Sequence, residues 1–272
     1  MTTEPNDDSY DNNNAAPLVE HLAELRTRLI KSAVFFIFGI IICFSVASKI
    51  FNFLAKPIAD ILRDNGQEPD LIFTGLQQGF MVNIQISLFG GFILAFPFIG
   101  FQLWKFVAPG LYKAEKGAFL PFLIASPLLF FLGASFAFYV VMPLAFDFFL
   151  GFQQETEGSV VEAVGITYLG TINEYLGLSM KFIIAFGVCF QLPVLLTLMG
   201  KAGLVSAVGL GRVRKYAVVS ILLVAAIVTP PDVITQIILF SVVYTLYELS
   251  IFMVKLVENQ RDKESEKPTD SV

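Results

Sequence analysis

Long apolar runs separated by shorter polar segments are the main pattern along the chain. A membrane-spanning helix needs about 20 predominantly apolar residues to cross a hydrocarbon layer about 30 Å thick. Runs of this kind recur, which predicts an all-α protein that crosses a membrane several times. We predict six spans, at residues 29–48, 79–104, 119–146, 178–199, 215–229 and 233–254.

The last two runs are predicted to form a short hairpin. Residues 216–228 form a run of 13 residues that is apolar except for Ser220, which makes about 20 Å of helix. The motif "TPPD" at 229–232 predicts a tight turn, and the returning run soon meets Thr235 and Gln236. A hairpin this short must thin the bilayer or be matched by another protein. The hydroxyl of Thr229 and the amide of Gln236 can offer such a protein hydrogen bonds where lipid offers none.

The polar segments divide the rest of the chain. Residues 1–17 and 257–272 are rich in polar and charged residues and are expected to be disordered tails, with one membrane domain at 18–256 between them. The N-terminal tail lacks the positively charged start and the apolar stretch of a secretory signal. The loop after the first span has apolar residues at helical spacing, which predicts an amphipathic helix broken at Pro57.

Charge sets the predicted orientation. Hydrophobic residues make up 56% of the chain and charged residues only 15%, against about 25% charged in a soluble domain. Of the 18 Lys and Arg residues, fourteen flank the spans on the side of the two termini and three lie in the loops of the other side. The positive-inside rule therefore places both termini in the cytoplasm.

Candidate chemistry is sparse. The only histidine is His21, and Cys43 and Cys189 each lie in an apolar run, where cysteine acts as a small hydrophobe. No metalloprotease, serine-hydrolase or phosphate-binding motif is present. We therefore expect no metal, no cofactor and no enzymatic activity. Chemistry alone leaves a transporter, a channel or a translocase subunit.

Four polar residues have both a structural and a functional interpretation. Glu24 lies four residues before Arg28, so the two can form an ordinary pair on a helix surface. Glu115 lies between two lysines and can be their solvated partner. Gln191 lies in the middle of a span, where an amide often serves helix packing. Asp232 follows two prolines and precedes a helix, as N-capping residues do.

Four motifs together resemble the TatC family of twin-arginine translocase subunits. They are "HLAELRTRL" before the first span, "FVAPGLYKAEK" after the second, "FGVCFQLP" in the fourth and "TPPD" in the last hairpin. Their order and spacing match the family over about residues 18–256, and the six spans with both ends inside match as well.

The resemblance implies a fold and a function. The fold would be a cupped, concave bundle of six helices in the cell inner membrane, with the last two helices short. The function would be to receive signal peptides with paired arginines on folded cargo and to act as the core of a translocase driven by the proton-motive force. Implied partners are the single-span subunits TatA and TatB, the lipid bilayer and further copies of the chain, with no nucleic acid.

The resemblance also implies roles for individual residues. Glu24 and Glu115 match two cytoplasmic glutamates that bind the arginine pair, and Arg26 and Phe106 match positions that support that site. A guanidinium offers a planar fork of donors that suits a carboxylate.

Further positions are implied to be structural or partner-binding, and one of them departs from the family. Pro57 matches an outer-loop proline and Asp232 the acid after the paired prolines, whereas Gln191 replaces a glutamate common in the family. Thr229 and Gln236 would face the helix of TatA or TatB.

Two other classes compete with this interpretation. A small-molecule transporter or channel would need a polar path through the bundle, for which the sequence offers mainly Gln191. A membrane-embedded hydrolase lacks the residues for its chemistry. The sequence leaves open the cargo, the copy number and whether TatA and TatB are separate partners.

Overall fold

The computed structural model describes residues 12–111, 120–152, 169–229 and 232–265. In these ranges the regular elements are helices, and one isolated backbone bridge joins Ile72 to Thr171. The predicted all-helical class is confirmed for this part of the chain. Five helical segments are long and apolar enough to span a membrane: 22–45, 78–106, 121–150, 172–201 and 233–261.

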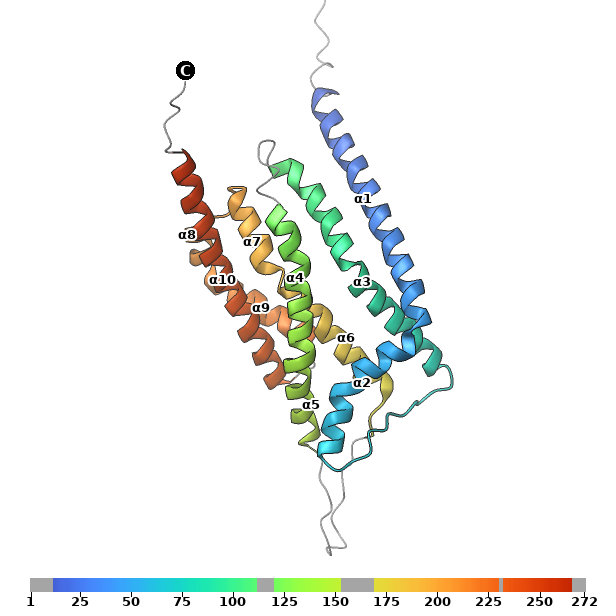
Figure 1. The fold of residues 1–272 in the computed structure, drawn as a ribbon. Coiled ribbons are helices and arrows are strands. Elements are labelled where there is room, and N and C mark those ends of the chain that lie inside the picture. Colours follow the sequence, from blue (N-terminus) through green and yellow to red (C-terminus); the bar gives the residue numbers. More distant parts are fainter. Residues whose placement is uncertain (1–11, 112–119, 153–168, 230–231, 266–272) are drawn as a thin grey trace, which may run out of the picture.

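Helices α1 (Asn12–Ser45) and α3 (Gln78–Leu111) run side by side for most of their length (Figure 1). Glycines permit this close approach. A Cβ added to Gly91 would lie 2.8 Å from the backbone nitrogen of Ile40, and one added to Gly39 would lie 2.9 Å from the carbonyl oxygen of Gly91. Small residues at such a crossing let two backbones touch, which is the usual basis of helix packing in membranes.

The third span is one rod built from α4 (Leu120–Phe136), the π-helical turn η2 (Ala137–Val141) and α5 (Met142–Leu150). Pro143 lies at the start of α5 and has no N–H to donate. A widened turn just before a proline is one way in which a spanning helix rearranges its backbone hydrogen bonds. The rod therefore stays continuous through the proline.

The fourth span is interrupted. It consists of α6 (Ile172–Cys189) and α7 (Leu192–Lys201), and the turn at Phe190 and Gln191 comes just before Pro193. Helix α6 packs against α4 around Phe130, Phe182 and Phe186, whose side chains are fully buried. These aromatic side chains fill the contact between the two helices.

Helix α2 (Ala47–Asp64) covers one end of the bundle (Figure 1). The predicted break at Pro57 is wrong, because the helix continues through it and Pro57 is buried. One lost hydrogen bond is outweighed by the burial of Leu54, Ile58 and Leu62 on the same face. The hydroxyl of Tyr175 in α6 donates to the carbonyl of Leu54 and ties α2 to the core.

The last two helices differ in length. Helix α9 (Arg214–Val228) has only 15 residues, whereas α10 (Val233–Ser265) has 33. The prediction that both are short is therefore wrong for α10. Its polar end, "VENQRDKES", contains strong helix formers and neither glycine nor proline, so the helix continues beyond the apolar run. A further short helix, α8 (Ala207–Arg212), precedes α9.

The predicted boundaries of the tails do not coincide with helix ends. Helix α1 begins at Asn12, inside the predicted N-terminal tail, and α10 ends at Ser265, inside the predicted C-terminal tail. The start of α1 and the end of α10 lie at the same end of the bundle (Figure 1).

Candidate functional site

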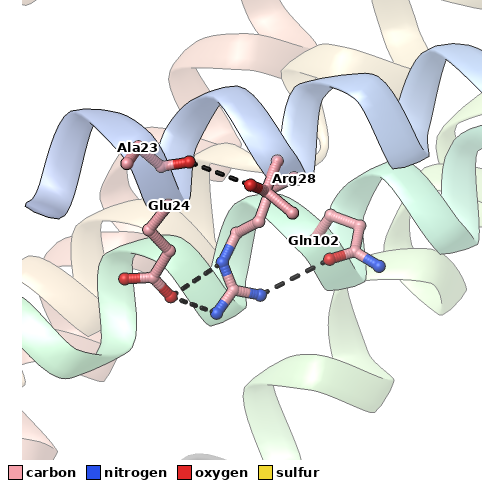
Figure 2. A network of polar contacts seen from close by, with 5 residues as sticks. Ala23, Glu24, Arg28 and Gln102 are labelled. Carbon is pink, nitrogen blue, oxygen red and sulfur yellow. Dashed lines mark hydrogen bonds and ion pairs between the residues drawn. The ribbon is translucent and has the colours of Figure 1, made fainter.

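The polar residues before the first span meet α3 at one end of the bundle. Glu24 and Arg28 are one helical turn apart on α1, so they share a face. Arg28 donates from Nε to Glu24 Oε1 at 3.0 Å and also from Nη2 to the same oxygen. Its Nη1 donates to Gln102 Oε1 of α3 at 3.4 Å. Figure 2 shows the guanidinium lying between the carboxylate and the amide.

Burial differs among these three side chains. Gln102 is only 8% exposed, because it lies in the contact between α1 and α3. The side chains of Arg28 and Glu24 are 21% and 36% exposed. The carboxylate is therefore reachable from outside the bundle while its guanidinium partner is held against α3.

Arg26 is exposed on α1 and does not share the face of Glu24, because residues two apart point in different directions on a helix. Phe106 is half-buried near the end of α3. In the preceding turn, the ammonium of Lys105 lies 4.3 Å above the ring of Phe101. Glu115 lies outside the described residues. The segment that contains it begins after Leu111, about 13 Å of helix beyond Gln102.

This arrangement can bind a cation. A partly exposed carboxylate on a rigid helix accepts charge-assisted hydrogen bonds, and here it already holds a guanidinium. The i,i+4 pairing of Glu24 with Arg28 was predicted from spacing. The role of Gln102 was not, because the contact depends on α1 packing against α3 and leaves no local signal.

Gln191 makes reciprocal contacts with α4. Its Nε2 donates to the carbonyl of Ser126 at 2.9 Å, and the hydroxyl of Ser126 donates to Gln191 Oε1 at 2.7 Å. These bonds join the interruption between α6 and α7 to the first half of α4. This geometry agrees with the structural interpretation of Gln191 as an amide that binds a neighbouring helix.

The turn between α9 and α10 is tied by local bonds. Asp232 accepts from the backbone N–H of Thr235 at 2.7 Å and from the hydroxyl of Thr235, which is the expected N-cap. Thr229 is buried and donates to the carbonyl of Ala225 at 2.9 Å, within its own helix. Gln236 is half-buried, and its amide donates weakly to the carbonyl of Leu222 at 3.5 Å.

The opposite end of this hairpin carries an ion pair. Arg214 donates to both oxygens of Glu248, at 2.7 and 2.8 Å, and the hydroxyl of Tyr244 donates to the same carboxylate at 3.0 Å. This fork-shaped contact joins the first residue of α9 to α10. In the described ranges, no group of three or more His, Cys, Asp or Glu side chains is close enough together to hold a metal ion.

The sequence and fold are similar to those of known proteins. The family described as Sec-independent protein translocase protein (TatC) matches residues 20–241. The TatC protein of Magnetococcus marinus is 48% identical over 246 residues, covering 90% of this chain and 86% of the relative. That of Aquifex aeolicus is 39% identical, covering 90% of this chain and 97% of the relative.

Two solved structures have the same fold. One is described as the crystal structure of the twin arginine translocase receptor TatC, with a TM-score of 0.74 and 39% identity, covering 88% of this chain and 99% of the solved chain. The other, of the receptor in the detergent DDM, gives a TM-score of 0.75 and 38% identity, covering 86% and 99%. The protein is a multi-pass membrane protein that belongs to the TatC family of Sec-independent protein translocases.

Proposed function

We propose that this chain is the signal-peptide receptor and core subunit of a twin-arginine translocase, which exports folded proteins across the cytoplasmic membrane at the expense of the proton-motive force. The description of the related solved structures as translocase receptors supports this function. The observation that carries it is Glu24, a partly exposed carboxylate on α1 that already holds a guanidinium.

Two acids would hold the two arginines of the signal peptide. Glu24 is on α1, and α1 lies beside α3. Glu115 is in the segment that follows α3 in the sequence. Arg26 and Phe106 would line the same site, the first as an exposed charge and the second as an apolar contact near the end of α3. Surrounding lysines and arginines would repel basic peptides that do not reach the acids.

The test uses the purified full-length protein and a fluorescent twin-arginine signal peptide, with a twin-lysine peptide as the matched ligand. Glu115→Gln and Glu24→Gln should each weaken binding of the twin-arginine peptide by about 100-fold, because each removes one charge-assisted bidentate contact. Glu68→Gln, an exposed acid after α2, is the control and should bind normally. Wild-type affinity in either site variant would refute the assignment.

The proposed topology is a cupped bundle with six crossings of the cell inner membrane. Both termini would lie in the cytoplasm. Helix α9 supplies the sixth crossing in addition to the five long spans. The start of α1 and the end of α10 lie at the same end of the bundle, as an even number of crossings requires (Figure 1). Cysteines at Lys31 and Lys255 should both be protected from impermeant reagents added outside the cell. Labelling of either one would contradict the topology.

The proposed partners TatA and TatB would dock beside the α9–α10 hairpin, in complexes with several copies of this chain. Helix α9 is short for a bilayer, and α9 and α10 expose large apolar residues, including Val219, Ile227 and Val233. Gln236 would supply the polar contact. Thr229 is buried, so its contribution would be to hold the end of α9.

Disulfide crosslinking tests this docking site. Cysteines at Val233, Gln236 or Phe240 should crosslink to cysteines in the outer half of the partner's single span. A cysteine at Leu132 of α4, which is also exposed, is the matched control and should crosslink much less. Equal crosslinking at Leu132 would contradict a preferred site on the hairpin.

The competing transporter or channel gains no support from the described residues. Gln191 was the main polar residue on which a path through the bundle depended. Its amide is paired with Ser126 across a helix contact. The geometry therefore describes an internal tie between helices, and we do not propose a small-molecule function.

A further inference from the structure

The carboxylate proposed to bind an incoming arginine already has an arginine of this chain as its partner. Arg28 donates from Nε and from Nη2, and both hydrogen bonds go to the same oxygen of Glu24, Oε1. Figure 2 shows this guanidinium between Glu24 and Gln102. The family resemblance assigns roles to Glu24 and Arg26, and Arg28 is left without one.

A second guanidinium cannot bind this carboxylate in the same way. A fork-shaped contact uses two parallel N–H donors and both carboxylate oxygens. Oε1 already accepts two hydrogen bonds from Arg28, and a second guanidinium would bring a like charge against the first. An incoming arginine therefore replaces Arg28 if it is to make the full contact.

Replacement is feasible because the resident pair is weak and Arg28 has a second acceptor. The side chains of Arg28 and Glu24 are 21% and 36% exposed, and partly solvated pairs one helical turn apart contribute little. The amide oxygen of Gln102 lies 3.4 Å from Nη1 of Arg28 and belongs to a buried side chain. Arg28 can therefore release Glu24 and keep a partner on α3.

We propose that Arg28 is an intramolecular competitor, a resident guanidinium that holds Glu24 until an arginine of the signal peptide displaces it. This inference rests on the proposed receptor function. A ligand must then bind Glu24 better than a guanidinium on the same helix does. This competition lowers the affinity of every cationic ligand by the same factor. A lysine ammonium makes no fork-shaped contact and binds less tightly from the start, so a twin-lysine peptide stays unbound at concentrations at which a twin-arginine peptide still binds.

The experiment measures the affinity of fluorescent twin-arginine and twin-lysine peptides for the full-length protein in nanodiscs. Arg28→Gln should tighten both by the same factor, about two- to fivefold, because it removes a weak competing pair and one like charge. Arg28→Lys should give an intermediate affinity, because lysine holds the carboxylate through a single group. A gain in affinity is not a result that damage to the fold produces.

Two controls separate competition from other causes. Lys31→Gln removes the same charge from an exposed position on α1 and should change affinity less than Arg28→Gln does. In a Glu24→Gln background, Arg28→Gln should give a gain no larger than that of Lys31→Gln, because the competition acts only through Glu24. Equal gains in Arg28→Gln and Lys31→Gln would show a general charge effect and overturn the proposal.

Weaker or unchanged binding in Arg28→Gln would also overturn it, since Arg28 would then orient Glu24 or have no effect on it. These results are distinguishable from failure of the proposed function. In that case the wild-type protein would bind the two peptides equally and Glu24→Gln would change nothing, and both proposals would fall. If the wild-type protein prefers the twin-arginine peptide but Arg28→Gln brings no gain in affinity, only the competition proposal is overturned. The proposed receptor function then stands.

Discussion

The α1–α3 pair meets through glycines, whereas the α9–α10 pair is held by polar contacts near its two ends. Backbones touch at Gly39 and Gly91, where an added Cβ would come within 2.9 Å of the facing helix. The short α9 is joined to α10 by the Arg214–Glu248 pair at one end and the weak Gln236 contact nearer the other. Van der Waals packing and hydrogen bonding both drive helix association in lipid. The first is most evident between α1 and α3, and the α9–α10 pair adds polar contacts to its apolar packing.

This difference relates structure to the proposed roles. A glycine contact tolerates little movement, because any added atom or tilt produces a clash. The pair that carries Glu24 and Gln102 is therefore a rigid platform for recognition. The α9–α10 pair also exposes apolar residues such as Val219, Ile227 and Val233, which suits a surface where another helix docks.

The largest expected effect comes from filling the glycine contact. Gly91→Ala places a Cβ 2.8 Å from the backbone of Ile40, and the two helices must separate. We expect a loss of about 1–3 kcal/mol in the free energy of unfolding, measured by thermal unfolding in detergent, with weaker signal-peptide binding. Gly100→Ala is the control, because its Cβ would lie 3.6 Å from Ser126 Oγ, an ordinary contact. Similar destabilisation by both variants would show that the close approach is unimportant.

An intermediate effect is expected at Gln191, where a polar contact joins two spanning helices. Gln191→Leu removes both hydrogen bonds to Ser126 and should cost about 1–2 kcal/mol of stability. Export of a folded reporter should fall more than signal-peptide affinity does. Gln191→Glu should be better tolerated, because a protonated carboxyl can both donate to and accept from Ser126. Normal export in the leucine variant would show that Gln191 has only a role in helix packing.

A smaller effect is expected from the ion pair of the hairpin. Arg214 and Glu248 are 50% and 34% exposed, and exposed pairs are screened by solvent. Glu248→Gln, Arg214→Gln and the double variant form a cycle in which thermal stability gives the coupling between the two side chains. We expect a measurable coupling that is smaller than the effect of Gly91→Ala. Strictly additive single effects would mean that the pair does not hold α9.

The smallest effect is expected at Thr229. Its hydroxyl bonds to the carbonyl of Ala225 in the same helix, so Thr229→Val should change stability by about 0.5–1 kcal/mol. Partner crosslinking through a cysteine at Gln236 should be unchanged. If Thr229→Val abolishes these crosslinks while stability is kept, the hydroxyl contacts the partner and the docking surface includes the end of α9.

Some features were accessible from local pattern and others were not. The i,i+4 pair of Glu24 with Arg28 and the cap by Asp232 follow from spacing along one helix, and both are present. Pro57 misled the prediction, because a proline breaks a helix only where packing does not compensate for the lost hydrogen bond. The length of α10 was underestimated, because a hydropathy pattern ends at the membrane surface while helix propensity does not.

Run length and the charge of the flanking residues are local properties, and they were enough to indicate a multi-pass helical protein with charged ends on one side. Which helices touch is not a local property. The approach of Gln102 to Arg28 and of Ser126 to Gln191 joins residues far apart in the chain. Packing of apolar surfaces and glycines selects these neighbours, and no periodicity within one helix records which neighbour a face will meet. For this reason the partners of the polar side chains came from the tertiary structure.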